Sequence, residues 1–222
     1  MKTKIVVFCM VVFIASCKTS SNTEKGTAIG VGAGAAGGAV IGNQMGNTAA
    51  GAIIGAVVGG VAGGLIGNYM DKQAEEIKHD IEGARIERIG EGIKITFNSG
   101  LLFKVNSFAL SEESKTNLEK LSTILNKYDD TNILIEGHTD NTGSAKHNKA
   151  LSDDRATSVA SQLKADNVNG GRLTNVGYGE DQAVGDNNTE IGRSENRRVE
   201  VAIYANKKLK KAAGDGLVSV PN

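Results

Sequence analysis

Two residues of opposite charge, Asp140 and Arg155, occur where the sequence pattern makes their types informative. Asp140 lies in the loop Gly137–Gly143, which follows a short apolar run and precedes a helical pattern. Loops after the carboxyl ends of strands are where open α/β folds hold ligands. Arg155 interrupts an otherwise aliphatic helical stripe with a spacing of four residues, which consists of Leu151, Arg155, Val159 and Leu163.

A guanidinium on a packing face needs an anionic partner, because an unpaired buried charge is costly. Asp140 and Arg155 together match a zwitterionic ligand, with carboxylate meeting ammonium and guanidinium meeting carboxylate. An internal Asp140–Arg155 ion pair without a ligand explains the same two residues. The residues alone leave both interpretations open.

The elements that position this pair alternate between strands and helices. A Ser111 cap followed by two glutamates begins one helix, and a second helix is predicted from Ala145 to Asp166. Strands are predicted at Arg85–Phe97 (two strands around Gly90–Gly92), Ile133–Ile135, Arg172–Tyr178 and Arg198–Tyr204. The expected fold class is an α/β (α+β) sandwich, with a small mixed β-sheet and helices on one face.

The amino-terminal segment has the pattern of a lipoprotein signal peptide. Its apolar run, Ile5–Ile14, is too short for a membrane-spanning helix, which needs about 20 residues, and fits the core of a secretory signal. It ends in Ala15-Ser16-Cys17, which resembles a lipobox. We therefore expect a signal peptide at residues 1–16, an acylated Cys17 carrying lipid such as palmitate, and a lipid-anchored tether over 17–25.

Residues 26–70 contain no charged side chain and are rich in glycine. Glycines recur every fourth residue in two ladders, which are Gly30, Gly34, Gly38, Gly42 and Gly46, then Gly51, Gly55, Gly59, Gly63 and Gly67. That spacing places glycine on one helical face, where backbones approach closely. The segment predicts a helical hairpin and resembles a glycine zipper. A flexible spacer remains the alternative.

Composition turns charged after Met70. We expect a connector helix at 71–82, the globular domain at 83–206 and a basic, flexible tail at 207–222. The 25 basic and 25 acidic residues give no net charge that favours nucleic acid. Gly32, Gly34 and Gly37 match a dinucleotide fingerprint by chance, since no strand precedes them and no acidic residue follows at the needed distance, so no cofactor is expected.

The stretch from Ile133 to Tyr204 resembles the OmpA-like peptidoglycan-binding domain. The matching runs are "IEGHTDNTG", "HNKALSDDRATSV", "VGYGE" and "IGRSENRRVEV", and "LFKVNSFAL" at Leu102–Leu110 is similar to the start of that domain. His147 and Ala183 depart from the family pattern, which commonly has Tyr and Pro at these positions.

The resemblance implies a site for the diaminopimelate of the peptidoglycan stem peptide. It assigns Asp140 to the ligand amine and Arg155 to its carboxylate. The other pocket residues implied by the resemblance are Thr139, Asn148, Leu151 and Arg198. The implied function is an outer-membrane lipoprotein, facing the periplasm, that tethers the membrane to the wall.

Other classes fit the sequence less well. His138 precedes Asp140 by two residues, but no Glu or Cys in the sequence pattern completes a metal site with it, so no metal is expected. No nucleophile elbow or paired acids indicate an enzyme. The alternative function is an assembly lipoprotein whose glycine zipper forms homo-oligomers in the bilayer, with wall binding secondary.

Acylation of Cys17 is testable directly. The substitution Cys17→Ala should leave an uncut or soluble precursor, because the thiol that accepts the lipid is gone. Metabolic labelling with a fatty acid, followed by membrane fractionation, measures this. A Cys9→Ala variant is the control and should be labelled normally. A mature, labelled Cys17→Ala protein in the membrane fraction contradicts the assignment.

Overall fold

The computed structural model describes residues 47–104 and 107–221. Within them, five strands form one mixed sheet in the order β1-β2-β5-β3-β4. β3 and β4 are parallel, and the other neighbouring strands are antiparallel. The strands are β1 (Ala84–Ile89), β2 (Gly92–Asn98), β3 (Thr131–Gly137), β4 (Leu173–Gly177) and β5 (Arg198–Ala205).

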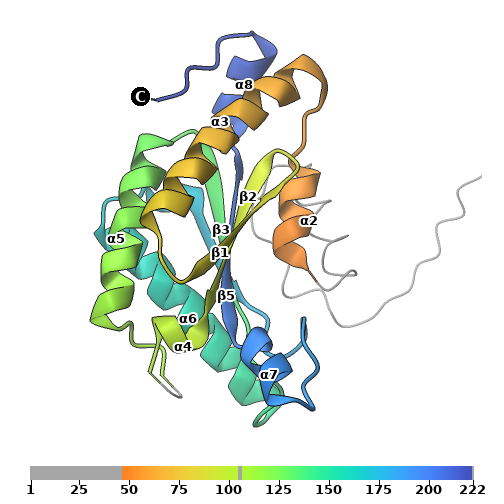
Figure 1. Cartoon of the computed structure of the whole chain (residues 1–222), viewed down its shortest axis with the longest axis vertical. Coiled ribbons are helices and arrows are strands. Elements are labelled where there is room, and N and C mark those ends of the chain that lie inside the picture. The colour runs from red at the N-terminus through yellow and green to blue at the C-terminus, as the bar shows by residue number, and fades with distance from the viewer. Residues whose placement is uncertain (1–46, 105–106, 222) are drawn as a thin grey trace, which may run out of the picture.

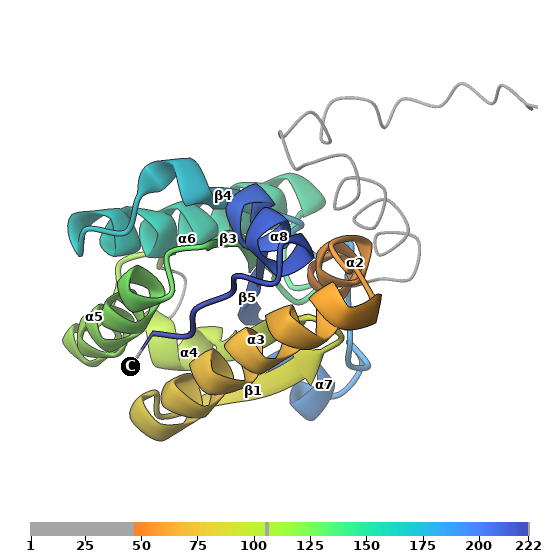
Figure 2. The same cartoon turned by 90° about the horizontal axis from the view of Figure 1, so that it is seen from above.

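Helices cover both faces of this sheet (Figures 1 and 2). They are α2 (Thr48–Gly55), α3 (Gly60–Asp80), α4 (Ser99–Leu102), α5 (Glu112–Lys127), α6 (Ala145–Ala165), α7 (Glu190–Asn196) and α8 (Lys207–Gly214), with a 3₁₀ turn at Gly170–Arg172. α3, α5 and α6 share one core with the sheet, and α2 packs on the opposite side. The α/β fold class with a small mixed sheet is confirmed.

The larger core lies between the sheet and helices α3, α5 and α6. Alternate residues of each strand face it, as on β5 with Val199, Val201 and Ile203, all fully buried. The cap that the sequence predicts for α5 is present, since the Ser111 hydroxyl accepts a hydrogen bond from the Ser114 amide at 3.1 Å. The predicted strands and the helix at 145–166 are also confirmed, within a few residues at their ends.

The expectation of helices on one face only is wrong, because α2 covers the other face. Ala52 and Ile53 of α2 are fully buried there against Ala202 and Tyr204. Leu134 of β3 also joins this second apolar cluster, so this side of the sheet needs a cover as well. α2 comes so close that a Cβ on Gly92 of β2 would lie 2.5 Å from the Ile53 Cγ2 atom.

The second glycine ladder is divided between two helices rather than forming one arm. α2 ends at Gly55, and Gly59 and Gly60 have positive φ angles of 73° and 64°, which favour glycine. The Glu91 carboxylate accepts hydrogen bonds from the amides of Val58 and Gly59 at 2.8 Å each. These contacts stabilise a turn, and the first ladder lies outside the described residues.

The structure does not support the predicted start of a connector at residue 71 or of a flexible tail at residue 207. α3 runs without a break across residues 70 and 71, and its residues Met70 and Ile77 are both buried in the larger core. Residues 207–214 form α8, whose Leu209 and Ala213 are buried in the same core. α8 lies beside α3 (Figure 1). The basic run forms a helix that packs on the core through two apolar residues spaced four apart, Leu209 and Ala213.

Among the described residues, no helix is both long enough and apolar enough to cross a bilayer.

Docking of α2 can be tested with two neighbouring isoleucines. Ile53 of α2 is fully buried against the sheet, whereas its neighbour Ile54 is 60% exposed. Ile53→Ala should lower the free energy of unfolding by about 2–5 kcal/mol, as for other buried aliphatic truncations. Ile54→Ala, the matched control, should change it by less than about 0.5 kcal/mol. Urea unfolding measures both, and equal effects would show that α2 does not dock on the sheet.

Candidate functional site

Two glycines bring the ends of the parallel strands β3 and β4 against α6. A Cβ on Gly137 would collide with the backbone of Ser152, and one on Gly177 would collide with the backbone of Asp153. The Ser152 hydroxyl accepts a hydrogen bond from the Gly179 amide at 2.8 Å. The loop that follows β3 therefore starts from a fixed position on α6.

The Asp140 carboxylate is held by two donors within this part of the structure. Its Oδ1 accepts a hydrogen bond from the Thr142 amide at 2.9 Å, and its Oδ2 lies 2.6 Å from Nη1 of Arg197. Burial opposes ionisation, but the hydrogen bonds from Arg197 and Thr142 outweigh it and lower the pKa of Asp140. The carboxylate is thus held in its charged form.

Asn148 and Thr139 support the loop. The Asn148 side-chain amide donates to the Asp140 carbonyl at 3.2 Å and to the Glu180 carboxylate at 2.6 Å. The Thr139 amide donates to the Gly179 carbonyl at 2.9 Å. Both residues are buried beside Asp140. The structure therefore gives them a positioning role in the loop.

Arg155 is buried on α6 without a carboxylate partner among the described residues. Its side chain is 5% exposed, its Nε donates to the Ser107 carbonyl at 3.1 Å, and its guanidinium lies 5.3 Å from the Phe103 ring centroid. Burial and then the positive charge of Arg197 lower the pKa of this guanidinium. Leu151, one turn earlier on α6, is half-buried.

A pocket of about 610 Å³ opens beside Arg155 and Arg197. Its lining is Ser99, Gly100, Leu101, Phe103, Lys104, Ser111, Glu113, Arg155 and Arg197. Three of these side chains are cationic and one is anionic, which suits a ligand with a carboxylate. Asp140 does not line the pocket itself but contacts it through Arg197.

The pocket residue that sequence reasoning missed is Arg197, and it takes the place predicted for Arg198. Successive residues of a strand point to opposite faces, so these two arginines diverge where β5 begins. Arg198 is 2% exposed and lies 2.7 Å from the Glu200 carboxylate, and its terminal nitrogen donates to the Gln182 carbonyl at 3.2 Å. The resemblance pointed to Arg198 alone, and only the strand register shows that its neighbour Arg197 faces the pocket.

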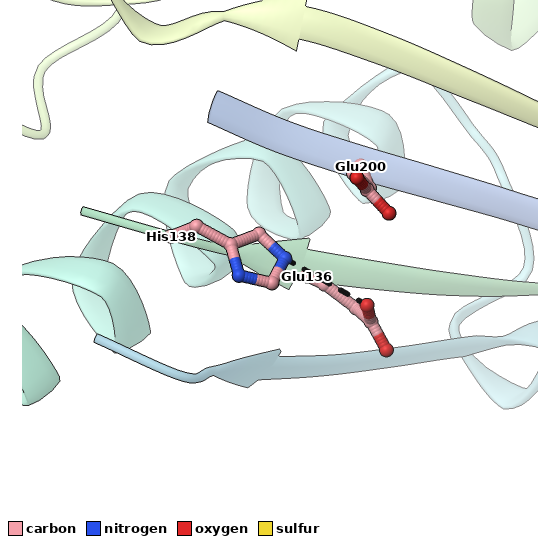
Figure 3. A group of neighbouring side chains, drawn as sticks. All are labelled: Glu136, His138 and Glu200. Carbon is pink, nitrogen blue, oxygen red and sulfur yellow. Dashed lines mark ion pairs between the residues drawn. The ribbon is translucent and has the colours of Figure 1, made fainter. Parts of the chain in front are cut away.

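Reasoning from sequence also missed the surroundings of His138. Strand register places Glu136 opposite Glu200, and His138 follows on the same face as Glu136. The three side chains are neighbours, as Figure 3 shows, and all of them are buried. Burial and then the negative charge of Glu200 raise the pKa of Glu136 to about 8. The expectation that no Glu accompanies His138 is therefore wrong.

Two known sequence families match different parts of the chain. A sequence model of the OmpA family matches residues 102–197, and a YMGG-like Gly-zipper model matches residues 1–71. The chain belongs to the OmpA family, and the expectation of a protein without enzymatic activity agrees with this membership.

Three relatives illustrate the match. The outer-membrane lipoprotein YfiB of Pseudomonas aeruginosa is 36% identical, over 52% of this chain and 68% of that protein. The peptidoglycan-associated lipoprotein of Buchnera aphidicola is 34% identical, over 50% of this chain and 64% of its own. The solved cell wall anchor of the T6SS from Pseudomonas aeruginosa is 28% identical with a TM-score of 0.53, covering 64% of this chain and 97% of that one.

The chain spans only about a third of the length of two outer membrane porins that it also matches. The shared part is the OmpA-like domain, which outer-membrane lipoproteins and porins carry alike.

The Asp140–Arg197 contact makes a titration prediction. Because the folded-state pKa of Asp140 is lowered, the pair stabilises the fold above the unfolded-state pKa, and this stabilisation is lost as pH falls through the folded-state pKa. Arg197→Gln should raise the pKa of Asp140, measured by carbon-13 NMR of the carboxyl group. Arg193→Gln, a control on the preceding helix α7 whose side chain pairs with Glu190 and not with Asp140, should not. An unchanged pKa in Arg197→Gln contradicts the contact.

Proposed function

We propose that this chain is an outer-membrane lipoprotein that binds peptidoglycan non-covalently, through the diaminopimelate of the stem peptide. The observation that carries the proposal is the buried Arg155 guanidinium, which lines a pocket and has no carboxylate partner among the described residues. Through an acylated Cys17, the protein tethers the outer membrane to the wall from the periplasmic side.

The Arg155 guanidinium is already oriented to bind a carboxylate. Its Nε is used by the Ser107 carbonyl, which fixes the plane of the group. The two terminal nitrogens have no partner among the described residues, and together they present the fork that binds a carboxylate with two parallel hydrogen bonds. A ligand carboxylate would remove the cost of an unpaired buried cation.

Asp140 supplies the opposite charge for the ligand ammonium. An ionised carboxylate accepts about four hydrogen bonds, and Asp140 uses one on each oxygen, so acceptor capacity remains. Arg197 lines the pocket and also bonds Asp140, so it keeps the carboxylate ionised and oriented. A zwitterion such as diaminopimelate, with carboxylate and ammonium on one carbon, matches these two charges.

The relatives support this ligand class. One is called a peptidoglycan-associated lipoprotein, and a solved relative is described as a cell wall anchor. YfiB, matched over two thirds of its length, is an outer-membrane lipoprotein. These descriptions favour the wall as the partner and the outer membrane as the location.

The docking of α2 restricts which residues could serve the alternative function, assembly through the glycine zipper. The buried face of α2 already packs on the sheet of its own chain, through Ala49, Ala52 and Ile53. That face cannot contact a second copy while α2 is docked. Homo-oligomers through the zipper therefore have to use the remaining glycine-rich residues.

Two truncations test wall binding. Arg155→Ala and Asp140→Ala should each reduce binding to isolated sacculi by roughly 30-fold to several thousandfold, since loss of one partner of a buried charge pair costs about 2–5 kcal/mol. Arg155→Ala should retain a near-native Tm, because no protein carboxylate loses its partner. Co-sedimentation measures binding, and thermal unfolding measures stability.

Two further variants serve as controls. Arg155→Lys keeps the charge but loses the fork, and should bind weakly. Arg85→Ala removes an arginine whose side chain is 66% exposed and should leave binding unchanged. Near-native sacculus binding by a folded Arg155→Ala protein would refute the proposed site.

A further inference from the structure

Three potential metal ligands meet on the sheet face that α2 covers. Glu136 and His138 lie two residues apart on β3 and just beyond it, and Glu200 lies opposite Glu136 on β5. Their exposed fractions are 0%, 1% and 1%. Figure 3 shows the imidazole and the two carboxylates turned toward a common space between the strands. This cluster takes no part in the pocket beside Arg155.

Most polar atoms of the cluster make no hydrogen bond of normal geometry in the described part of the chain, although the Ala49 amide lies close enough to Glu136 to favour its charged form. These atoms are both carboxylate oxygens of Glu136, both ring nitrogens of His138 and Oε2 of Glu200. Unsatisfied groups of this kind are rare in interiors because each costs about 1–3 kcal/mol, and more when charged. Five in one place require an explanation.

The neighbouring cations satisfy only part of this need. Arg198 binds Oε1 of Glu200 at 2.7 Å, which leaves Oε2 directed at the cluster. Lys94 lies near but is 3.3 Å from Glu87 instead. The Tyr178 ring stacks on the His138 imidazole, with 5.6 Å between the ring centroids.

The distances fit one small cation. The three ligand atoms lie within 4.8 Å of one another, and Nε2 of His138 is 3.7 Å from Oε2 of Glu136. Bonds of about 2.0–2.2 Å in tetrahedral geometry place two zinc ligands roughly 3.3–3.6 Å apart. Small side-chain movements therefore complete the geometry, and a fourth position remains for water.

We propose that Glu136, His138 and Glu200 bind one divalent transition-metal ion of the zinc class, at a site separate from the pocket beside Arg155. One imidazole nitrogen and two carboxylate oxygens form a ligand set that zinc accepts. The ion would join β3 to β5 beneath α2. His138 also lies two residues before Asp140, so the same ion would fix the start of the ligand-binding loop.

The chain provides its own control for surface binding, because it has three histidines. His79 and His147 are exposed, and His138 is buried. The full chain, purified in detergent and treated with chelator, should bind one Zn²⁺ by isothermal titration and gain about 5 °C or more in Tm with zinc in excess. A His79→Gln/His147→Gln variant should behave in the same way, and His138→Gln should lose both effects.

Two further measurements keep the test independent of folding defects. Co²⁺ added to the unaltered protein should give the visible absorption of a tetrahedral site, and Glu136→Gln should abolish it. Zinc binding that disappears only with His79 and His147 would overturn the proposal. So would a Glu136→Gln protein that is more stable than the parent at every zinc concentration, because a proton shared by the two carboxylates would then account for the cluster.

Discussion

The close contact of α6 with the ends of β3 and β4 is the constraint on which the position of the Asp140 loop depends. Gly137 and Gly177 leave no space for a side chain between these strands and the helix backbone. Because of that contact, the loop after β3 begins at a fixed height over α6. Asp140 on the loop and Arg155 on the helix are then positioned by the same interface, although fifteen residues separate them in sequence.

Strand β5 divides the molecule into two chemical environments. All of its residues are buried, so its alternation sends aliphatic side chains to one core and Arg198, Glu200, Ala202 and Tyr204 to the other face. That second face is partly charged and would be solvated in a sheet without a cover. Docking of α2 removes the water from it, which is why ordinary Glu and His side chains there become a tightly enclosed cluster.

The sequence predicts the helices and strands better than it predicts the tertiary contacts of their side chains. Helix caps, strand alternation and the motif runs located the strands, α5, α6 and the Asp140 loop correctly. The position of Arg197 was not available from them, because two consecutive arginines at the start of a strand differ only in which face each side chain meets. The partners of His138 were missed for a related reason, since Glu200 joins it through the pairing of β3 with β5.

Packing also explains the errors at the ends of the domain. Glycine spacing correctly indicated helices, but Gly59 and Gly60 could equally continue a helix or turn it, and the Glu91 carboxylate decides for the turn. α8 was hidden because its apolar residues are few and its lysines many. In both places a contact from a distant segment, invisible in the local pattern, selects the conformation.

The docking of α2 shortens the stretch of chain that can separate the domain from residue 17. In the proposed lipoprotein, a glycine-rich segment that acted wholly as a linker would let the domain stand away from the lipid on Cys17 by the full contour of residues 18–82. With α2 fixed on the sheet, the part of the chain that could act as a linker ends at Asn47. Residues 18–46 reach at most roughly 100 Å when fully extended, at about 3.3–3.6 Å per residue, and far less where they are helical. If the proposed function holds, the docked helix thus limits how far from the membrane this domain can reach the wall.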